Sequence, residues 1–311
     1  MNQMFTNIFN WVNHRLPIVN TFERHLSKHP VPKKVNFWYL FGALASVVLI
    51  IQIVSGIWLI MPYENTEEGA FASVEYIMRD VDYGWVIRYM HTTGASLFFA
   101  VVYLHMFRGL LYGSYQKPRE LVWIFGCTIY LAMMAEGFLG YVLPYGQMSY
   151  WGAQVIISLF GAIPYVGESL ELWVRGDYYI SGITVSRFFA LHVVALPLVL
   201  IALVFLHLVA LHEVGAGNPE GVDIEAHLDD DGIPLDSVPF FPYKVLNALV
   251  GIGVFMTVFA IIMFFFPEGG GYFIEMANFE EANPLVTPEH IAPVWYYAPY
   301  YTMLRAIPDP L

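Results

Sequence analysis

Four histidines lie in two long apolar stretches of the sequence at nearly equal spacing. His91 and His105 are 14 residues apart, and His192 and His207 are 15 residues apart. An α-helix rises about 1.5 Å per residue, so each pair is separated by roughly 21 to 22 Å along its helix. Because each residue turns the helix by about 100°, both histidines of each stretch can face the same neighbouring helix.

Two histidines at each of two depths could hold two metal centres. A zinc or copper site would gather its ligands around one point, whereas two ligands per depth suit two haem irons with two axial imidazoles each. Such irons have no open position, so they would pass electrons and would not bind oxygen. If the two helices run parallel, an outer b-type haem lies on His91 and His192, and an inner one lies on His105 and His207.

A simpler explanation for a histidine in an apolar helix is a hydrogen bond to a backbone carbonyl or a neighbouring helix. It serves for one histidine, but four at matched depths argue against it, because ionisable residues inside a membrane mark functional sites. A transporter whose histidines relay protons is a second class of function. It predicts a colourless protein, whereas haem absorbs visible light.

Glycines repeat the same interval in two further apolar stretches. The pairs 14 residues apart are Gly42 with Gly56 and Gly126 with Gly140. Helix packing through small residues would also explain them, but the matching interval favours room for a porphyrin at each haem depth. Haem propionates need cations. Three arginines near the expected helix ends could bind them, or could simply reach the interface: Arg88, Arg108 and Arg187.

Membrane helices must position these residues. The chain has 311 residues, of which 58% are hydrophobic and 13% are charged, whereas soluble domains carry about 25% charged residues. A helix needs roughly 20 apolar residues to cross the hydrocarbon core. Five stretches approach this length: 37–61, 89–107, 121–136, 188–211 and 245–267. The third of them is long enough only if it continues through Glu136. We therefore predict an all-α, polytopic membrane helical bundle with a four-helix core around two haems, plus interfacial helices.

The positive charges orient this bundle. Lysine and arginine are frequent in the N-terminal segment and in the loop 108–119. Both should therefore lie on the cytoplasmic side of a bacterial inner membrane, and spans two and four then run in the same direction. The acidic loop after span four fits the rule only in part. The net charge of −12 argues against nucleic acid as a partner.

The segments around the histidines resemble the cytochrome b of quinol:cytochrome c oxidoreductase, respiratory complex III. The likeness covers nearly all of the chain and is carried by the segments 88–91, 105–109, 140–152, 187–192 and 207–213. It implies a proton-motive quinone cycle. A ubiquinone-type quinol is oxidised at an outer site. One electron goes to a Rieske iron–sulfur protein, and the other crosses both haems to reduce quinone at an inner site. The resemblance also implies a membrane-anchored c-type cytochrome as a partner and a homodimeric complex.

The resemblance assigns residues to both quinone sites. The outer site lies between the segment 138–156 and the segment that begins at residue 293. Its matching residues are Phe138, Tyr141, Gly152, Pro293, Trp295, Tyr296 and Tyr301. The inner site lies near His212, five residues beyond His207. Quinone is an apolar ring with two carbonyls, so each site needs an aromatic cleft with polar groups and a titratable group to move protons.

The sequence departs from the family pattern in several places. Val294 stands where the family commonly has the glutamate of Pro-Glu-Trp-Tyr, so the usual outer carboxylate is missing. Asn247 and Ala248 stand in place of a Lys-Asp pair at the inner site. The 15-residue histidine spacing in span four is one longer than in many respiratory relatives. Relatives usually continue with further spans after Arg305, so we expect this sequence to be a fragment.

Glu136 is a candidate replacement for the missing carboxylate. Oxidation of quinol releases two protons, and Val294 cannot accept one. Glu136 lies inside the third span, five residues before Tyr141, where a lone carboxyl is costly unless it is neutral or paired. We therefore expect it to serve the outer site. The simpler alternative is a protonated Glu136 bonded to a neighbouring helix, since five residues turn it about 140° from Tyr141.

The expected organisation has three parts. Residues 1–36 form an N-terminal surface amphipathic segment, and residues 37–220 form the di-haem four-helix core. Residues 221–311 form an inner loop, a fifth transmembrane helix and an outer quinol-site segment. A haem-anchoring subunit of a dehydrogenase is a rival within the electron-transfer class. It would not need long outer segments rich in aromatic residues and proline.

Overall fold

The computed structural model describes residues 3–17, 19, 22–23, 27–221 and 226–307. Within them, five helices are long and apolar enough to cross a membrane. They are Phe37–Leu59, Gly84–Leu111, Glu120–Val142, Gly182–Val214 and Phe240–Phe265. The predicted fold class and number of spans are therefore confirmed, and the third span does continue through Glu136.

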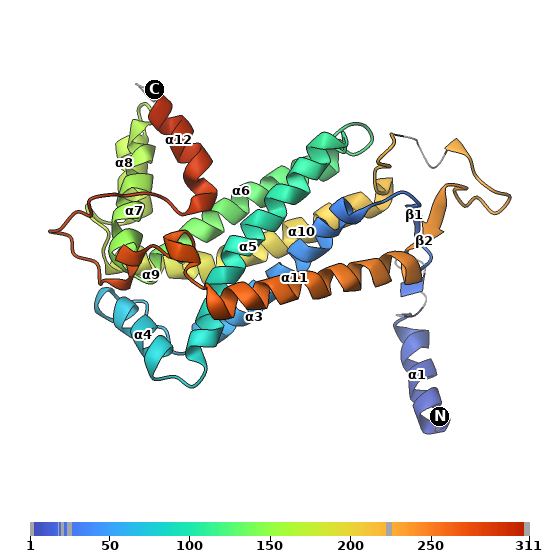
Figure 1. Ribbon diagram of the computed structural model, residues 1–311, viewed down its shortest axis with the longest axis horizontal. Helices are drawn as coiled ribbons and strands as arrows, with labels where there is room; N and C mark the ends of the chain where they lie inside the picture. The colour runs from blue at the N-terminus through green and yellow to red at the C-terminus, as the bar shows by residue number, and fades with distance from the viewer. Residues whose placement is uncertain (1–2, 18, 20–21, 24–26, 222–225, 308–311) are drawn as a thin grey trace.

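Four spans form the core, and a fifth lies beside it (Figure 1). The helices within the spans are α3 (Phe41–Leu59), α5 (Gly84–Leu111), α6 (Glu120–Val142), α9 (Gly182–Ala190), α10 (Leu196–Val214) and α11 (Val245–Phe265). α3 packs along α5, and α6 packs along α10. α11 lies against α5 and also contacts α3. The core is thus two helix pairs, with α11 outside the first pair.

Shorter helices gather at one end of the bundle (Figure 1). They are α4 (Glu67–Arg79), α7 (Gln147–Ser158), α8 (Gly167–Arg175) and α12 (Ala298–Ala306). α4 begins after Thr66, whose hydroxyl accepts the backbone N–H of Gly69 at 3.0 Å and so caps the helix. From the distribution of positive charges, the sequence predicts that this end of the bundle is the outer one, and we call it the outer end.

The opposite end carries the N-terminal segment. α1 (Gln3–Arg15) points away from the bundle (Figure 1), as a surface helix would; residues 18, 20–21 and 24–26 of that segment lie outside the described ranges. Two short strands, β1 (Pro30–Pro32) and β2 (Ser237–Pro239), pair antiparallel and join this segment to the chain just before the fifth span. The N-terminal segment is therefore attached to the inner end of the fifth span.

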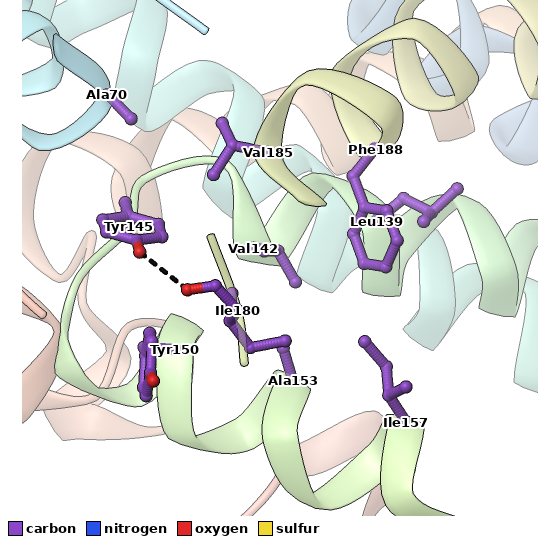
Figure 2. Close-up of a cluster of buried hydrophobic side chains, with 10 residues drawn as sticks. All are labelled: Ala70, Leu139, Val142, Tyr145, Tyr150, Ala153, Ile157, Ile180, Val185 and Phe188. Carbon is purple, nitrogen blue, oxygen red and sulfur yellow. Dashed lines mark hydrogen bonds between the residues drawn. The ribbon is translucent and has the colours of Figure 1, made fainter. Parts of the chain in front are cut away.

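A cluster of buried side chains holds α7 and α9 against the end of α6 (Figure 2). Its members are Ala70, Leu139, Val142, Tyr145, Tyr150, Ala153, Ile157, Ile180, Val185 and Phe188. Burial of a large apolar side chain contributes about 1.5–3 kcal/mol. The hydroxyl of Tyr145 donates to the carbonyl oxygen of Ile180 at 2.9 Å, so this buried polar group is satisfied. The cluster fixes α7 where the outer site is expected.

A second cluster attaches the C-terminal segment to the spans. Its members are Phe99, Val102, Tyr130, Met133, Leu200, Val294 and Tyr296. Tyr296 stacks on Phe99 with ring centroids 3.9 Å apart, and its carbonyl oxygen accepts the hydroxyl of Tyr103 at 2.6 Å. The segment around residue 294 is therefore packed against α5 and α6, beside the end of α6 that the first cluster holds.

Candidate functional site

The four histidines form two facing pairs. His91 and His192 have ring centroids 6.2 Å apart, with their planes at 85°. His105 and His207 have ring centroids 6.4 Å apart, with their planes at 69°. The second span supplies one member of each pair and the fourth span supplies the other. These are the two pairs expected from the spacing.

The gap within each pair fits a single iron. A metal–imidazole bond is about 2 Å long, so two such bonds and the radii of two rings account for centroid distances of 6.2 and 6.4 Å. A zinc or copper site would need a denser group of protein ligands. Among the described residues, no group of three or more His, Cys, Asp or Glu side chains could hold a metal ion. Two imidazoles per metal therefore suit haem.

A π-helical turn brings His192 into register with His207. The turn covers Leu191–Ala195 and holds one residue more than an α-helical turn. His192 and His207 are 15 residues apart. Because the π-turn takes up one of these residues, the two histidines lie about as far apart along the helix as 14 regular residues would place them. His91 and His105 on α5 are also 14 residues apart. Pro197 explains where the turn occurs, since proline has no N–H to continue the α-helical hydrogen bonds.

Each of the four predicted glycines lies against one histidine ring. The pairs are Gly42 with His105, Gly56 with His91, Gly126 with His207, and Gly140 with His192. An added Cβ would lie 3.0 to 3.4 Å from the ring carbon Cε1 in the first three pairs, and it would collide with the ring at Gly140. The glycines were expected to make room for porphyrin. In the structure, the missing side chain of each glycine lets one imidazole ring lie close to the backbone of the neighbouring helix.

Hydrogen bonds orient the rings of the outer pair. Nδ1 of His91 lies 2.9 Å from the hydroxyl oxygen of Ser55. Nδ1 of His192 lies 3.0 Å from the carbonyl oxygen of Glu136 and 3.1 Å from its carboxyl oxygen. Such partners fix the tautomer and orientation of a metal-binding histidine and leave Nε2 for the metal.

The position of Glu136 corrects one expectation from the sequence. Its carboxyl faces His192, and Glu136 does not line the outer cleft described below. The reason is helical geometry, because five residues turn Glu136 about 140° away from Tyr141. The expected service of Glu136 to bound quinol does not agree with this arrangement.

The three predicted arginines are placed differently from one another. Arg88 is buried near the outer end of α5, with only 7% of its surface exposed. Arg108 lies over the ring of Tyr39, with its guanidinium carbon 4.2 Å from the ring centroid. Arg187 is exposed and donates to the carbonyl oxygen of Trp173 at 2.8 Å. Arg187 therefore contacts α8, and its expected role toward a haem propionate stays a prediction.

An apolar cleft lies between α6, α7 and the C-terminal segment. The empty space among its lining residues is about 280 Å³, a figure that includes the open solvent at its mouth. Its lining consists of Phe138, Tyr141, Gly152, Ile156, Ala292, Pro293, Val294 and Tyr297. The lining therefore joins both segments that were expected to form the outer site. Ile156 ends the segment 138–156 that was expected to form one wall, one helical turn after Gly152. Ala292 and Tyr297 were not predicted.

Three expected outer-site residues do not line this cleft. Trp295 donates its indole N–H to the hydroxyl of Ser96 at 3.3 Å, and Tyr296 is buried in the second cluster. The hydroxyl of Tyr301 lies 3.5 Å from the carbonyl oxygen of Ile291. These residues position the segment, and Tyr297 takes the place in the lining that was expected for Tyr296.

Glu275 is a polar neighbour of the cleft that the sequence did not reveal. The hydroxyl of Tyr141 donates to its carboxyl. Burial raises the pKa of Glu275 above its usual range, and the hydrogen bond from Tyr141 opposes that rise. Glu275 lies far from Tyr141 in the sequence, in a segment without helical periodicity, so no spacing signal could have paired the two.

At the inner end, His212 is not alone. It stacks on His29, with ring centroids 4.4 Å apart and planes at 28°. His29 directly precedes β1, and the pairing of β1 with β2 holds that part of the chain at the inner end of the bundle. Asn247 of α11 is exposed. The structure thus adds a second titratable side chain beside the expected inner-site residue.

Comparison with known proteins agrees with this geometry. Residues 26–215 match the family model "Cytochrome b/b6/petB", and residues 281–311 match "Cytochrome b(C-terminal)/b6/petD". A cytochrome b of Allochromatium vinosum is 57% identical over 307 residues, covering 97% of this chain and 74% of the relative. A cytochrome b of Rickettsia conorii is 49% identical over 304 residues, covering 98% and 73%. A solved structure described as hyperthermophilic respiratory complex III superposes with a TM-score of 0.89 at 39% identity, covering 97% of this chain and 77% of that one.

Proposed function

Since the chain belongs to the cytochrome b family, we propose that it carries electrons across a membrane through two b-type haems, from quinol oxidised in the outer cleft to quinone reduced near His212. As a cytochrome b, it is a membrane-embedded subunit of a quinol:cytochrome c oxidoreductase. The observation that carries the two-haem proposal is the pair of facing imidazoles at each of two depths.

The residues around each histidine pair have distinct tasks. His91 with His192, and His105 with His207, would each hold a haem iron, which would supply one-electron redox chemistry. Ser55 and the backbone carbonyl of Glu136 fix the outer rings, and the four glycines let the rings approach their neighbouring helices. Arg88 and Arg108 offer positive charge for haem propionates at the two ends of α5.

The outer cleft suits the ring of a ubiquinone-type quinol. Its walls are aromatic and aliphatic, with the hydroxyl of Tyr141 beside them. Its two walls come from segments that the two buried clusters hold against α6. A Rieske iron–sulfur protein would take one electron at this end, a membrane-anchored c-type cytochrome would receive it, and the complex would be a homodimer.

The inner site and the orientation follow from the opposite end. His212 and His29 are the titratable pair that would supply protons to quinone there. The basic N-terminal segment and the loop between α5 and α6 lie at this same end (Figure 1). We assign this end to the cytoplasmic face of a bacterial inner membrane, with the N-terminus inside.

Visible spectroscopy with a redox titration tests the proposal. Membranes containing the protein, reduced with dithionite, should show b-type haem absorption that titrates with two separate midpoint potentials. A colourless protein would instead support the proton-relaying transporter. A single potential, or one haem per chain, would overturn the two-haem assignment.

A further inference from the structure

We infer that Glu275, acting through the hydroxyl of Tyr141, is the proton acceptor for quinol bound in the outer cleft. The inference rests on the proposed function, because it names the proton acceptor of that same site. It concerns a residue that neither the histidine spacing nor the family pattern indicated.

The contact between the two side chains joins the cleft to a carboxyl outside it. The side chain of Tyr141 lines the cleft, and its hydroxyl donates to Glu275. Glu275 belongs to the segment that follows α11, and it is half-buried. Its carboxyl therefore contacts the hydroxyl of Tyr141 and is also partly exposed at the outer end. A carboxyl placed in this way can take a proton from an apolar site and release it to solvent.

The backbone around Glu275 is fixed to α7, so the contact does not depend on a free loop. Oδ1 of Asn278 accepts the backbone N–H of Ser149 at 2.8 Å. The carbonyl oxygen of Glu280 accepts the backbone N–H of Gln147 at 2.9 Å, and the N–H of Ala282 donates to the carbonyl oxygen of Tyr145 at 3.1 Å. These hydrogen bonds hold the segment that carries Glu275 against the end of α6, where Tyr141 lies.

The charges around Glu275 suit a carboxylate that can take up a proton. The titratable groups that face it are Tyr141 from α6 and Tyr296 from the C-terminal segment. Within the described ranges it forms no ion pair with lysine, arginine or histidine. Burial raises the pKa of Glu275, which brings the carboxyl closer to the strength of base that accepts a proton near neutral pH.

Other acids are less suited to this task. Val294 occupies the position of the family's usual carboxylate and is buried in the cleft wall. The carboxyl of Glu136 faces His192, and Glu171 pairs with Arg175. Among the residues that the structure describes, Glu275 is the carboxyl that is hydrogen-bonded to a cleft-lining side chain.

The proton transfer is balanced within the proposed reaction. Quinol loses two electrons and two protons. As one quinol O–H bond breaks, its proton passes to the oxygen of Tyr141, whose own proton passes to Glu275 to give a carboxylic acid. Tyr141 ends unchanged. The two electrons go to the iron–sulfur partner and to the outer haem, and the second proton leaves on the side of that partner.

The test compares Glu275→Gln with Glu289→Gln in the purified complex. Glu289 is an exposed acid in the same segment, so its variant should react at the wild-type rate. With the inner site inhibited, reduction of the outer haem by ubiquinol should be at least about a hundredfold slower in Glu275→Gln, the low end of the range for a positioned proton acceptor. The wild-type rate should fall as the pH drops through the raised pKa, because only the ionised carboxyl can accept, and Glu275→Gln should lose this dependence.

Four further measurements separate a proton acceptor from a structural residue. Tyr141→Phe should be slowed to a similar extent, and combining it with Glu275→Gln should add little. Val294→Glu should restore part of the rate to Glu275→Gln by placing a carboxyl in the cleft. If the Gln variant does not assemble, Glu275→Asp keeps a carboxyl and should react at an intermediate rate. Infrared difference spectra of the wild type during quinol oxidation should show a carboxylic acid signal from Glu275.

Distinct outcomes would contradict this inference and the proposed function. An unchanged rate and pH profile in Glu275→Gln would overturn the inference, as would a slowed rate with an unchanged pH profile and no rescue by Val294→Glu. Both results presuppose a wild-type protein with two haem potentials. A wild type without them would overturn the proposed function itself.

Discussion

His29, on the N-terminal segment, stacks on His212 at the inner end of α10, with ring centroids 4.4 Å apart. The pair joins the residue just before β1 to one a helical turn beyond His207, and it lies where the inner quinone site is proposed. The sequence alone did not suggest this contact, because the two histidines are 183 positions apart in the chain.

We predict that His212→Leu slows reoxidation of the inner haem by quinone and leaves outer-site quinol oxidation intact. His212 would contact quinone directly, so its loss removes both a polar contact and a proton donor. His29→Gln should have a smaller effect of the same kind, and the double variant should resemble His212→Leu. Flash- or mixing-induced haem kinetics measure both steps separately. Equal loss at both quinone sites would contradict the assignment of His212.

Single histidine substitutions should remove one haem at a time. His91→Leu or His192→Leu should abolish the outer haem, and His105→Leu or His207→Leu should abolish the inner one, because an iron that loses one axial imidazole is no longer held in a six-coordinate site. The remaining haem should keep its own midpoint potential. A redox titration of each variant checks this. The pairing would be wrong if His91→Leu and His207→Leu removed the same haem.

The glycine contacts predict a difference between Gly140→Ala and Gly253→Ala. A Cβ on Gly140 would collide with the ring of His192, whereas a Cβ on Gly253 meets no atom within 4 Å. Overpacking a closed site costs about 1–3 kcal/mol, so Gly140→Ala should weaken binding of the outer haem and broaden or shift its spectrum. Gly253→Ala should have wild-type spectra. Identical spectra for both variants would show that the ring can move away at no cost.

The π-turn predicts opposite results for two single-residue deletions in the fourth span. Removing Val194 should turn Leu191–Ala195 into an ordinary α-helical turn and keep both histidines in register, so both haems should remain. Removing Phe205, which lies in regular helix, should rotate His207 by about 100° relative to His192. That variant should lose the inner haem. Retention of both haems after the second deletion would mean that the register is not set by the π-turn.

The parts of the fold with a regular period were predictable from the sequence. Long apolar stretches predicted the five spans because membrane helices have a simple length requirement. The 14- and 15-residue spacings predicted which histidines face each other, since helical geometry converts spacing into depth and direction. The π-turn was not predicted. An irregular turn changes how residue spacing translates into depth and direction, but it leaves the amino-acid composition of the span unchanged.

The quinone sites were predicted less completely because their walls come from distant or irregular segments. Resemblance placed Phe138, Tyr141, Gly152 and Pro293 in the cleft, as the structure has them. Tyr296 was expected in the lining instead of Tyr297. The two lie in the short 3₁₀ helix Trp295–Tyr297, where successive side chains point about 120° apart. Glu136 was assigned by its depth in the membrane, although its direction around the helix turns it to His192.

The π-turn has a consequence for the distance over which an electron must tunnel. Tunnelling rates fall steeply with the separation of donor and acceptor, so a displacement of His192 along its helix would change the rate of transfer between the haems. By absorbing one residue within Leu191–Ala195, the chain keeps both ends of the relay at the depths that α5 dictates. The additional residue of the fourth span is thereby confined to a single turn, and two haems held by these histidines would keep the separation that α5 sets.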